Sequence, residues 1–482
     1  LYLDKTLSWK EHVNNILQKA GKYLNALRAI AHYKWGSDPN VSLLYYRTTI
    51  RSIMDFGSIF YGQAKKTILR PLDLLQNKSL RLCLGFLRST PLDVIHAESG
   101  ELPLLHRRQV LSDRYVLKIM ATDPLLYNNI CQLNTKCLTY RFWIKKNLPN
   151  YIESFQKISC LKEKVKPQVK LPAFSSQLYL AQVKLKIAFL EDFSKLPRIF
   201  RDSALLDTLQ TLWPETYCVY TDGSRIEDAV GCAVYDPQSE YMKKYSLPSI
   251  TSVYTAEMVA IDLALQYIST LPNIKYTILS DCQSILQKLK NISRSKDVNH
   301  LEIGIAERVH ALKNKGVQVS FGWIKGHCGL RNNEIVDKLA REAAIQGELL
   351  DLQLPYKDYY RYLYKNEFNK WENLFKNCTK GYFYKTNIRN PGRPWFKDHI
   401  LDKHMVTTIC RLRSNHAVCR AYLCKIGQVV SSLCPSCEVR EDYKHLVMTC
   451  SKHQSDRLLF KDKIKKHFQE SATLRKFYFL II

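Results

Sequence analysis

The stretch that decides the fold reads Tyr217-Cys218-Val219-Tyr220-Thr221-Asp222-Gly223-Ser224. A strand-favouring run is followed here by Asp-Gly-Ser, which is typical of a turn. Two further short strands are predicted at 231–235 and 241–247, after which the apolar pattern alternates between helical and strand spacing. The predicted helices cover 255–270, 283–289, 301–312 and 333–345, and the later strands cover 276–279 and 317–324. This order indicates an α/β domain at 216–346 with a mixed five-stranded sheet and flanking helices.

Net charge separates this domain from the rest of the chain. The 482 residues carry 72 Lys and Arg against 44 Asp and Glu, a net charge of +28. Residues 216–346 hold 15 of the basic and 14 of the acidic residues, so the remainder carries 57 against 30, or +27. An imbalance of this size indicates a polyanionic partner, of which nucleic acid is the commonest.

Cysteine usage and hydropathy bear on where the chain works. The fifteen cysteines are an odd number and mostly scattered singly, which favours a reducing compartment with free thiols and a metal site. No apolar run reaches the roughly 18 residues that span a bilayer, and the N-terminus lacks both a starting Met and a signal peptide. We therefore expect an intracellular protein of the nucleus or cytoplasm, not secreted and without a membrane partner, that is cut from something longer.

Four carboxylates stand where metal chemistry in this domain needs them. Asp222 follows the first strand, Glu257 lies in the first turn of the first long helix, Asp281 ends the fourth strand, and Asp337 lies on the last helix. Clustered carboxylates repel one another unless cations bind among them. Mg²⁺ prefers such oxygen ligands, and two ions roughly 4 Å apart clamp an in-line phosphodiester displacement. Taken singly, each acid is better explained as a helix cap or a turn residue.

The four acids in this order, together with Gly326-His327-Cys328-Gly329, resemble the ribonuclease H family. The form they resemble is that of non-LTR (LINE-like, jockey-type) retrotransposon reverse-transcriptase polyproteins. The matching segments are 220–224, 255–261, 280–284, 323–329, 333–334 and 337–340. The resemblance implies an RNase H-like fold that hydrolyses the RNA strand of RNA–DNA hybrids with two Mg²⁺ ions, or Mn²⁺.

Site roles follow from the same resemblance. It implies that Asp222, Glu257, Asp281 and Asp337 bind the metal ions and that His327 assists proton transfer and product departure. The alternative is a catalytically idle, nucleic-acid-binding remnant that positions a hybrid for a missing polymerase. All four acids are present, whereas a decayed scaffold is expected to have lost at least one. We therefore favour an active enzyme that binds hybrid and other nucleic acid and needs no small-molecule cofactor.

Two residues beside the histidine loop have simpler explanations. Lys325 has the right charge to touch a phosphate, but a lysine beside a loop is more often solvated. Trp323 lies among apolar strand residues and is better explained as core than as a platform for base stacking.

A second set of metal-binding residue types lies near the C-terminus. Cys434, Cys437, His445 and Cys450 give the spacing C-x2-C-x7-H-x4-C. Three thiolates and one imidazole complete a tetrahedral, structural Zn²⁺ site without an open position. The alternative, free thiols beside a coincidental histidine, requires chance to produce both halves of the pattern. The spacing differs from that of the retroviral zinc knuckle and resembles the carboxy-terminal zinc segment of the same polyproteins.

The front of the chain is predicted to be helical. Apolar residues recur at helical spacing from Leu7 to Ile30, and a second helical run covers about 41–54. Segments 3–12, 81–87 and 89–92 resemble the region that follows the reverse-transcriptase palm, but no Tyr-x-Asp-Asp-type motif is present. We interpret 1–115 as a thumb- or connection-like helical bundle without activity of its own. The remaining parts are expected as a basic linker at 116–215, a basic helical linker at 347–430, the zinc-binding segment at 431–455 and a basic tail at 456–482.

Overall fold

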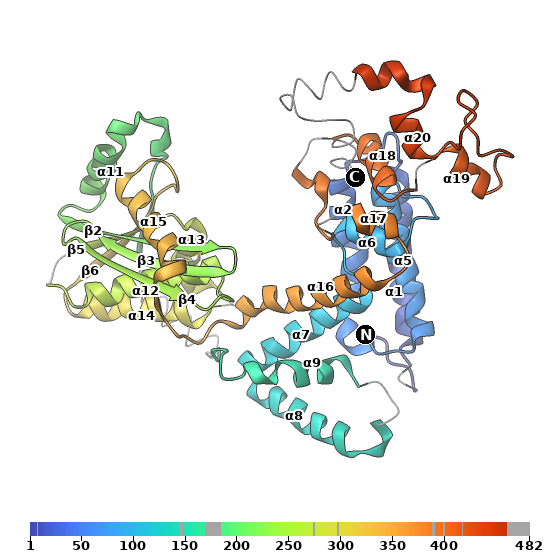
Figure 1. Cartoon of the computed structure of the whole chain (residues 1–482). Helices are drawn as coiled ribbons and strands as arrows, with labels where there is room; N and C mark the ends of the chain where they lie inside the picture. Colours follow the sequence, from blue (N-terminus) through green and yellow to red (C-terminus); the bar gives the residue numbers. More distant parts are fainter. Residues whose placement is uncertain are drawn as a thin grey trace. The chain divides into compact units, whose positions relative to one another are not determined.

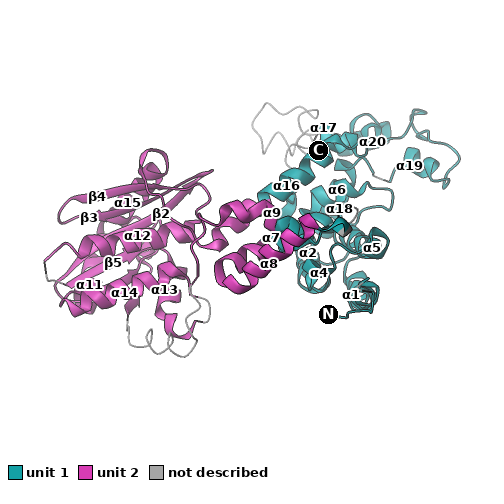
Figure 2. Cartoon of the chain, turned by 90° about the horizontal axis from the view of Figure 1, so that it is seen from below, with its two compact units in different colours: residues 1–113, 140–154, 365–482 teal, residues 114–139, 155–364 magenta. Residues whose placement is uncertain are grey.

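The computed structural model describes residues 1–6, 8–143, 148–168, 185–272, 275–295, 298–387, 391–398, 401–416 and 418–459. The chain forms two compact units, shown in Figure 2. Unit 1 comprises residues 1–113, 140–154 and 365–482, and unit 2 comprises residues 114–139 and 155–364. Among the residues described, no helix is both long enough and apolar enough to span a membrane. Leu7 and residues 460–482, which make up most of the predicted basic tail, lie outside the described residues.

Unit 2 is built on a mixed sheet of seven strands (Figure 1). They are β1 Lys186–Phe189, β2 Thr216–Ile226, β3 Ala229–Asp236, β4 Tyr241–Leu247, β5 Lys275–Ser280, β6 Gln318–Trp323 and β7 Glu348–Leu349. Across the sheet the order is β1-β6-β5-β2-β3-β4-β7. Strands β2, β3 and β4 are antiparallel neighbours, whereas β1, β6, β5 and β2 run parallel. The five predicted strands are β2 to β6.

The predicted count of five strands is wrong, because β1 and β7 extend the sheet at its two edges. They are only four and two residues long and lie outside 216–346, so neither carries a usable alternation of apolar and polar residues. The predicted turn after Thr221 is also wrong, because Asp222 pairs with Ala233 and Gly223 with Cys232 inside the β2–β3 ladder. The chain turns later, at Glu227, where φ is 53°.

Helices cover both faces of the sheet (Figure 1). One face packs against helices α12, α13 and α14, and the other against α11 and α15. Their bounds are α11 Arg198–Leu212, α12 Val253–Ile268, α13 Gln283–Lys290, α14 His300–Asn314 and α15 Arg331–Gln346. Successive side chains of β2 point to opposite faces, so Val219 joins the first core and Tyr220 the second.

Segments on both sides of the predicted domain belong to unit 2. Val165 forms a parallel bridge with Leu354, and the backbone N–H of Lys166 donates to the Leu354 carbonyl at 2.9 Å. Leu350 and Leu352 pack against the core around β3 and α12. The flanks therefore complete the unit rather than trailing from it. Helix α8, Pro124–Thr139, also belongs to unit 2.

Unit 1 is helical in the residues described. Its helices are α1 Lys10–Ile30, α2 Pro39–Tyr45, α3 Ser52–Asp55, α4 Ser58–Tyr61, α5 Lys66–Leu84, α6 Leu92–Ser99, α17 Tyr382–Asn387, α18 Lys403–Arg413, α19 Arg420–Lys425 and α20 Tyr443–Met448, and a π-helical turn covers Tyr46–Arg51. Three further helices have residues in both units: α7 Leu104–Thr122, α9 Asn150–Ile158 and α16 Tyr359–Asn377. Val13 and Leu80 share one core with Val406. The helical pattern predicted before Ile30 is thus confirmed by α1.

Candidate functional site

Three of the four predicted acids meet beside the central strands. Asp222 lies on β2, Asp281 directly follows β5, and Glu257 lies on α12. Each offers a carboxylate oxygen within 4.8 Å of the other two. Strands β2 and β5 are parallel neighbours, which places the two aspartates side by side. A Cβ at Gly223 would come within 2.5 Å of the Glu257 backbone nitrogen, so glycine is what allows α12 to approach β2 so closely.

The three carboxylates are buried or half-buried close together and repel one another, which raises their pKa values. Burial raises the pKa of Asp222 to about 7, and Asp281 and Asp337 add to the shift. Burial, followed by the charge of Asp222, also raises the pKa of Glu257 well above its ordinary value. Glu257 Oε2 is buried and has no hydrogen-bond partner among the described residues. A divalent cation that prefers oxygen ligands fits these residues, because it would neutralise the repulsion and give this oxygen a partner.

The fourth acid stands at the edge of the trio. Asp337 on α15 is not one of the three acids within 4.8 Å, but its charge helps to raise the pKa values of Asp222 and Asp281. Asp337 Oδ1 accepts a hydrogen bond from Arg341 Nε at 2.9 Å, and His327 Nδ1 lies 3.4 Å from Asp337 Oδ2. The His327 side chain is 76% exposed, so it faces solvent. Sequence reasoning missed Arg341, although its spacing of four residues from Asp337 on one helix was the available signal.

Two neighbours hold the loops around Asp281. Trp323 is half-buried against the core, as expected, and it also donates a hydrogen bond from Nε1 to the Asp281 carbonyl at 2.9 Å. Lys325 is exposed, as expected, and its Nζ also lies 2.7 Å from Asp192 Oδ2. A Cβ at Gly326 would come within 2.5 Å of Asp281 Oδ2, so the loop passes directly beside this carboxylate.

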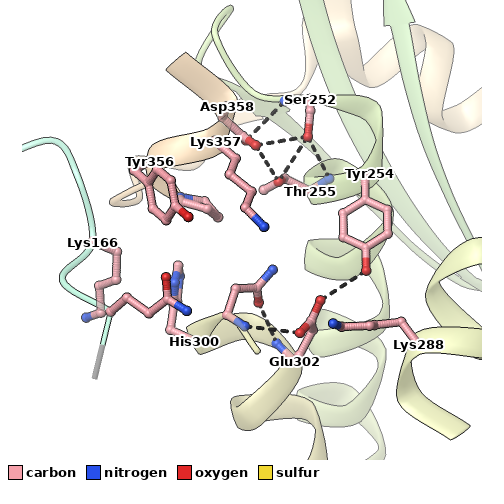
Figure 3. Close-up of a pocket in the computed structure, with 13 residues that line it drawn as sticks. Lys166, Ser252, Tyr254, Thr255, Lys288, His300, Glu302, Tyr356, Lys357 and Asp358 are labelled. Carbon is pink, nitrogen blue, oxygen red and sulfur yellow. Dashed lines mark hydrogen bonds between the residues drawn. The ribbon is translucent and has the colours of Figure 1, made fainter. Parts of the chain in front are cut away.

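A pocket of about 380 Å³ surrounds the first turn of α12, the helix that carries Glu257 (Figure 3). The buried carboxylate of Asp358 accepts hydrogen bonds from Ser252 N at 3.1 Å, from Ser252 Oγ at 3.0 Å and from Thr255 Oγ1 at 3.0 Å. Sequence reasoning missed this pocket because part of its lining comes from the flanks of 216–346. The lining includes three lysines, Lys166, Lys288 and Lys357.

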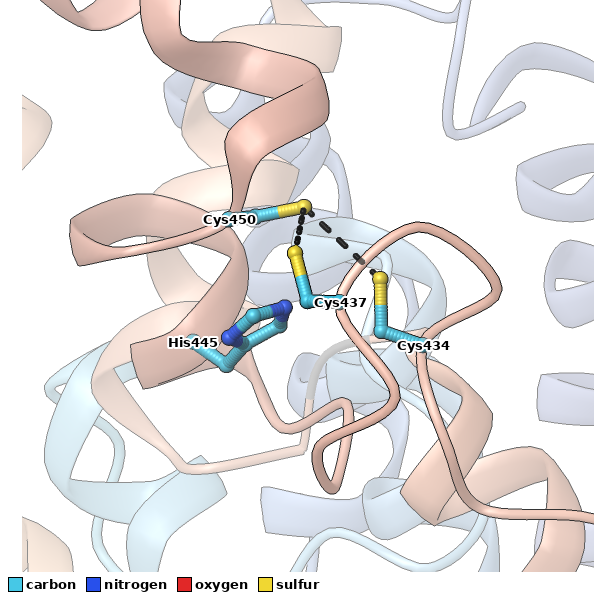
Figure 4. A group of neighbouring side chains, drawn as sticks. All are labelled: Cys434, Cys437, His445 and Cys450. Carbon is cyan, nitrogen blue, oxygen red and sulfur yellow. Dashed lines mark hydrogen bonds between the residues drawn. The ribbon is translucent and has the colours of Figure 1, made fainter.

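The predicted cysteines and histidine also meet, in unit 1 (Figure 4). One ligand atom from each of Cys434, Cys437, His445 and Cys450 lies within 4.8 Å of the others. His445 Nδ1 lies 3.1 Å from Thr449 Oγ1, whereas its Nε2 is buried without a hydrogen-bond partner in the described part of the chain. The hydroxyl and the backbone N–H of Ser451 donate hydrogen bonds to Cys437 and lower the pKa of its thiol to about 6. Three cysteine sulfurs and an imidazole nitrogen without a hydrogen-bond partner fit one tetrahedral Zn²⁺.

Comparison with known proteins identifies the α/β domain. The family described as RNase H matches residues 214–345. A ribonuclease H of Pseudoalteromonas translucida (strain TAC 125) is 30% identical over 151 residues, which is 28% of this chain and 95% of that protein. These two matches confirm the RNase H-like fold predicted for the domain.

Solved structures align with the same share of the chain. RNase H1 from the halophilic archaeon Halobacterium salinarum NRC-1 is 19% identical, with 27% of this chain and 96% of that one covered and a TM-score of 0.21. LC11-RNase H1 in complex with RNA/DNA hybrid is 17% identical, with 27% and 96% covered and a TM-score of 0.22.

Proposed function

Because the chain belongs to the ribonuclease H family through residues 214–345, we propose that it is a metal-dependent endonuclease that hydrolyses the RNA strand of RNA–DNA hybrids. One observation carries this proposal. The three carboxylates of Asp222, Glu257 and Asp281 converge within 4.8 Å, and Glu257 Oε2 is buried without a partner among the described residues. A purely structural acid cluster would be expected to have that oxygen hydrogen-bonded.

In this proposal, Asp222, Glu257 and Asp281 hold the catalytic metal and Asp337 completes the set from the edge. Two bound Mg²⁺ ions, or Mn²⁺, would supply an activated water and charge stabilisation for an in-line phosphodiester displacement. Arg341 keeps the Asp337 carboxylate in place. His327, exposed on its loop and 3.4 Å from Asp337, moves a proton at the solvent side as product leaves.

The same unit also offers contacts for a polyanionic backbone. The pocket at the first turn of α12 contains three lysines beside the carboxylates of Asp358 and Glu302, and the lysines attract phosphate groups.

We further propose that the chain derives from a non-LTR, jockey-type retrotransposon polyprotein. The proposal is supported by a helical unit with a Cys/His cluster in the same chain as the ribonuclease H domain. Cys434, Cys437, His445 and Cys450 would hold one structural Zn²⁺. The segment boundaries predicted from the sequence, after residues 115, 215, 346, 430 and 455, belong to the same proposal.

The proposed activity is tested with labelled hybrid, single-stranded RNA and single-stranded DNA, each with and without Mg²⁺. We expect the parent to cut only the RNA of the hybrid, and only with Mg²⁺. Asp281→Asn should lose cleavage while hybrid binding stays nearly intact, because the change removes a metal ligand and also relieves repulsion. Asp207→Asn, the same change at an exposed position on α11, is the matched control and should cut normally. A parent that binds hybrid but never cuts it would instead identify an idle remnant.

A further inference from the structure

Unit 1 contains a strongly basic pocket that the proposed hydrolysis does not use. It has a volume of about 560 Å³ and lies where the C-terminal ends of α1 and α5 meet α18. Aromatic and apolar side chains share the lining with positive charge, and no Asp or Glu contributes to it. The cationic residues of the lining are Arg28, Lys78, Arg81, Arg88 and Arg411.

These five cations differ from other arginines of the same unit. Arg107 lies 2.8 Å from the carboxylate of Asp55, and Arg413 lies 2.7 Å from that of Glu98. By contrast, none of the five pocket cations has a carboxylate oxygen within 4.0 Å among the residues that the structure describes. Arg81 Nε is buried without a hydrogen-bond partner in the same set.

Hydrogen bonds to backbone carbonyls use only a small part of the donor groups in this basic pocket. Arg81 donates to the Thr90 carbonyl at 3.3 Å, and Arg411 donates to the Gly85 carbonyl at 2.8 Å. Only the bond to Gly85 lies at the end of α5, where Gly85 is the C-cap residue, and each bond uses a single nitrogen of a guanidinium that carries five donors. Lys78 and Arg88 are exposed and take part in neither bond. Gathering like charges in this way is unfavourable unless an anion binds among them.

Aromatic rings stand beside the cations. Tyr33 is 38% exposed, and the Arg411 guanidinium lies 5.1 Å from the centre of its ring. Trp35 stacks on His32 with ring centres 4.7 Å apart and is 70% exposed. Single-stranded nucleic acid is recognised by this combination, in which cations follow the backbone and aromatic faces stack on unpaired bases. A duplex, with its bases already stacked, makes no use of the exposed rings.

We propose that this basic pocket of unit 1 binds single-stranded nucleic acid, with backbone phosphate among the five cations and a base on Trp35. The proposal rests on the proposed function only in taking nucleic acid as the partner, and not on hydrolysis. It assigns a ligand to the helical part of the chain, for which the sequence indicated no activity.

The test measures binding of a labelled oligoribonucleotide to the full chain carrying Asp222→Asn. The buffer contains neither Mg²⁺ nor a chelator, so that nothing is cut and any zinc stays bound. In this background, Lys78→Gln with Arg88→Gln should weaken binding about tenfold and reduce the salt slope by about 1.4, as expected for two lost phosphate contacts to a single strand. The matched control is Lys65→Gln with Lys66→Gln, the same charge change at exposed positions at the far end of α5, roughly 20 Å away by helical rise. It should bind like the parent.

Trp35→Ala separates stacking from charge. It should weaken binding of the oligoribonucleotide about fivefold or more and leave binding of an abasic oligonucleotide unchanged. Equal losses in the pocket and control variants would overturn the proposal, because the pocket would then contribute only to a general field. So would pocket-dependent binding of duplex or of phosphatidylserine vesicles without any effect on the single strand. Failure of hybrid cleavage in the parent leaves these outcomes readable, since no measurement depends on it.

Discussion

The two candidate metal sites of this chain are built in opposite ways. The Cys/His cluster takes all its ligands from residues 434–450, so two loops and one short helix suffice to assemble it. The acidic trio comes from residues 222–281 and has Asp337 at its edge. The four acids therefore come together only when the sheet, α12 and α15 are all in place. A local site depends on its own loop, whereas a distributed site depends on everything that positions its elements.

The ligand atoms of the two candidate sites also differ in chemistry. Thiolates and an imidazole satisfy Zn²⁺ completely and leave no position for a reacting water. The trio offers hard oxygen ligands, of which those of Asp281 are only half-buried, and this suits an ion that must also contact a substrate. We therefore expect the first site to support folding and the second to support hydrolysis.

The largest expected effect is a double dissociation between the sites. Asp222→Asn should abolish hybrid cleavage, a loss of at least about a thousandfold for a missing ligand of a two-metal site, with zinc content unchanged. Cys437→Ser should lose the zinc and unfold the region around 431–455, because small zinc sites couple metal binding to folding. Its cleavage rate should stay near that of the parent.

The readouts are elemental analysis for zinc, limited proteolysis for the 431–455 region, and hybrid cleavage in Mg²⁺. A parent without zinc would remove the Cys/His site from the comparison. A well-folded Cys437→Ser protein without cleavage would show that the two sites are not independent.

The contrast also explains what sequence could predict. The Cys/His ligands follow from spacing alone, because all of them lie within one short segment. Each acid taken singly is better explained as a helix cap or a turn residue, so the set of four was identified through motifs in a fixed order. Partners that act across the fold were missed: Asp358 comes from outside the predicted domain, and the two-residue strand β7 carries no pattern. Asp222 itself was expected in a turn, because a ladder partner such as Ala233 is invisible to local turn preferences.

The second effect is a pH dependence confined to the acidic site. Burial raises the pKa of Asp222 from 3.8 to about 7, so the folded state keeps a proton that the unfolded state releases. In Mg²⁺-free buffer, the contribution of this carboxyl to stability should therefore be greatest below pH 4, fall as pH rises toward 7, and level off above it. Asp222→Asn should remove this fall and raise Tm at pH 8 by several degrees, with little change near pH 4. A Tm difference between parent and Asp222→Asn that does not change with pH would mean that Asp222 is not buried as described.

The third effect concerns His327, the exposed histidine beside Asp337. His327→Ala should slow turnover about tenfold, because an exposed proton carrier is partly replaced by water. Zinc content and metal-free stability should not change, since the side chain is 76% exposed. The measurement is kcat for hybrid cleavage by the parent and the variant at the same Mg²⁺ concentration. A loss as deep as that of Asp222→Asn would give His327 a different role from the one proposed.

The smallest effect asks whether the distributed site depends on residues outside the family match. Asp358 is buried and accepts three hydrogen bonds from Ser252 and Thr255, at the start of the helix that carries Glu257. Asp358→Ala leaves those donors without their acceptor, at a cost of about 1–3 kcal/mol in the free energy of unfolding. A slightly displaced α12 should lower kcat about threefold, which corresponds to about 0.7 kcal/mol, while zinc content stays at the parent value. Asp358→Asn keeps one acceptor oxygen and should recover most of the rate. If the alanine variant loses stability but keeps the parent kcat, the flank only braces the fold, and the acidic site is more self-contained than its geometry indicates.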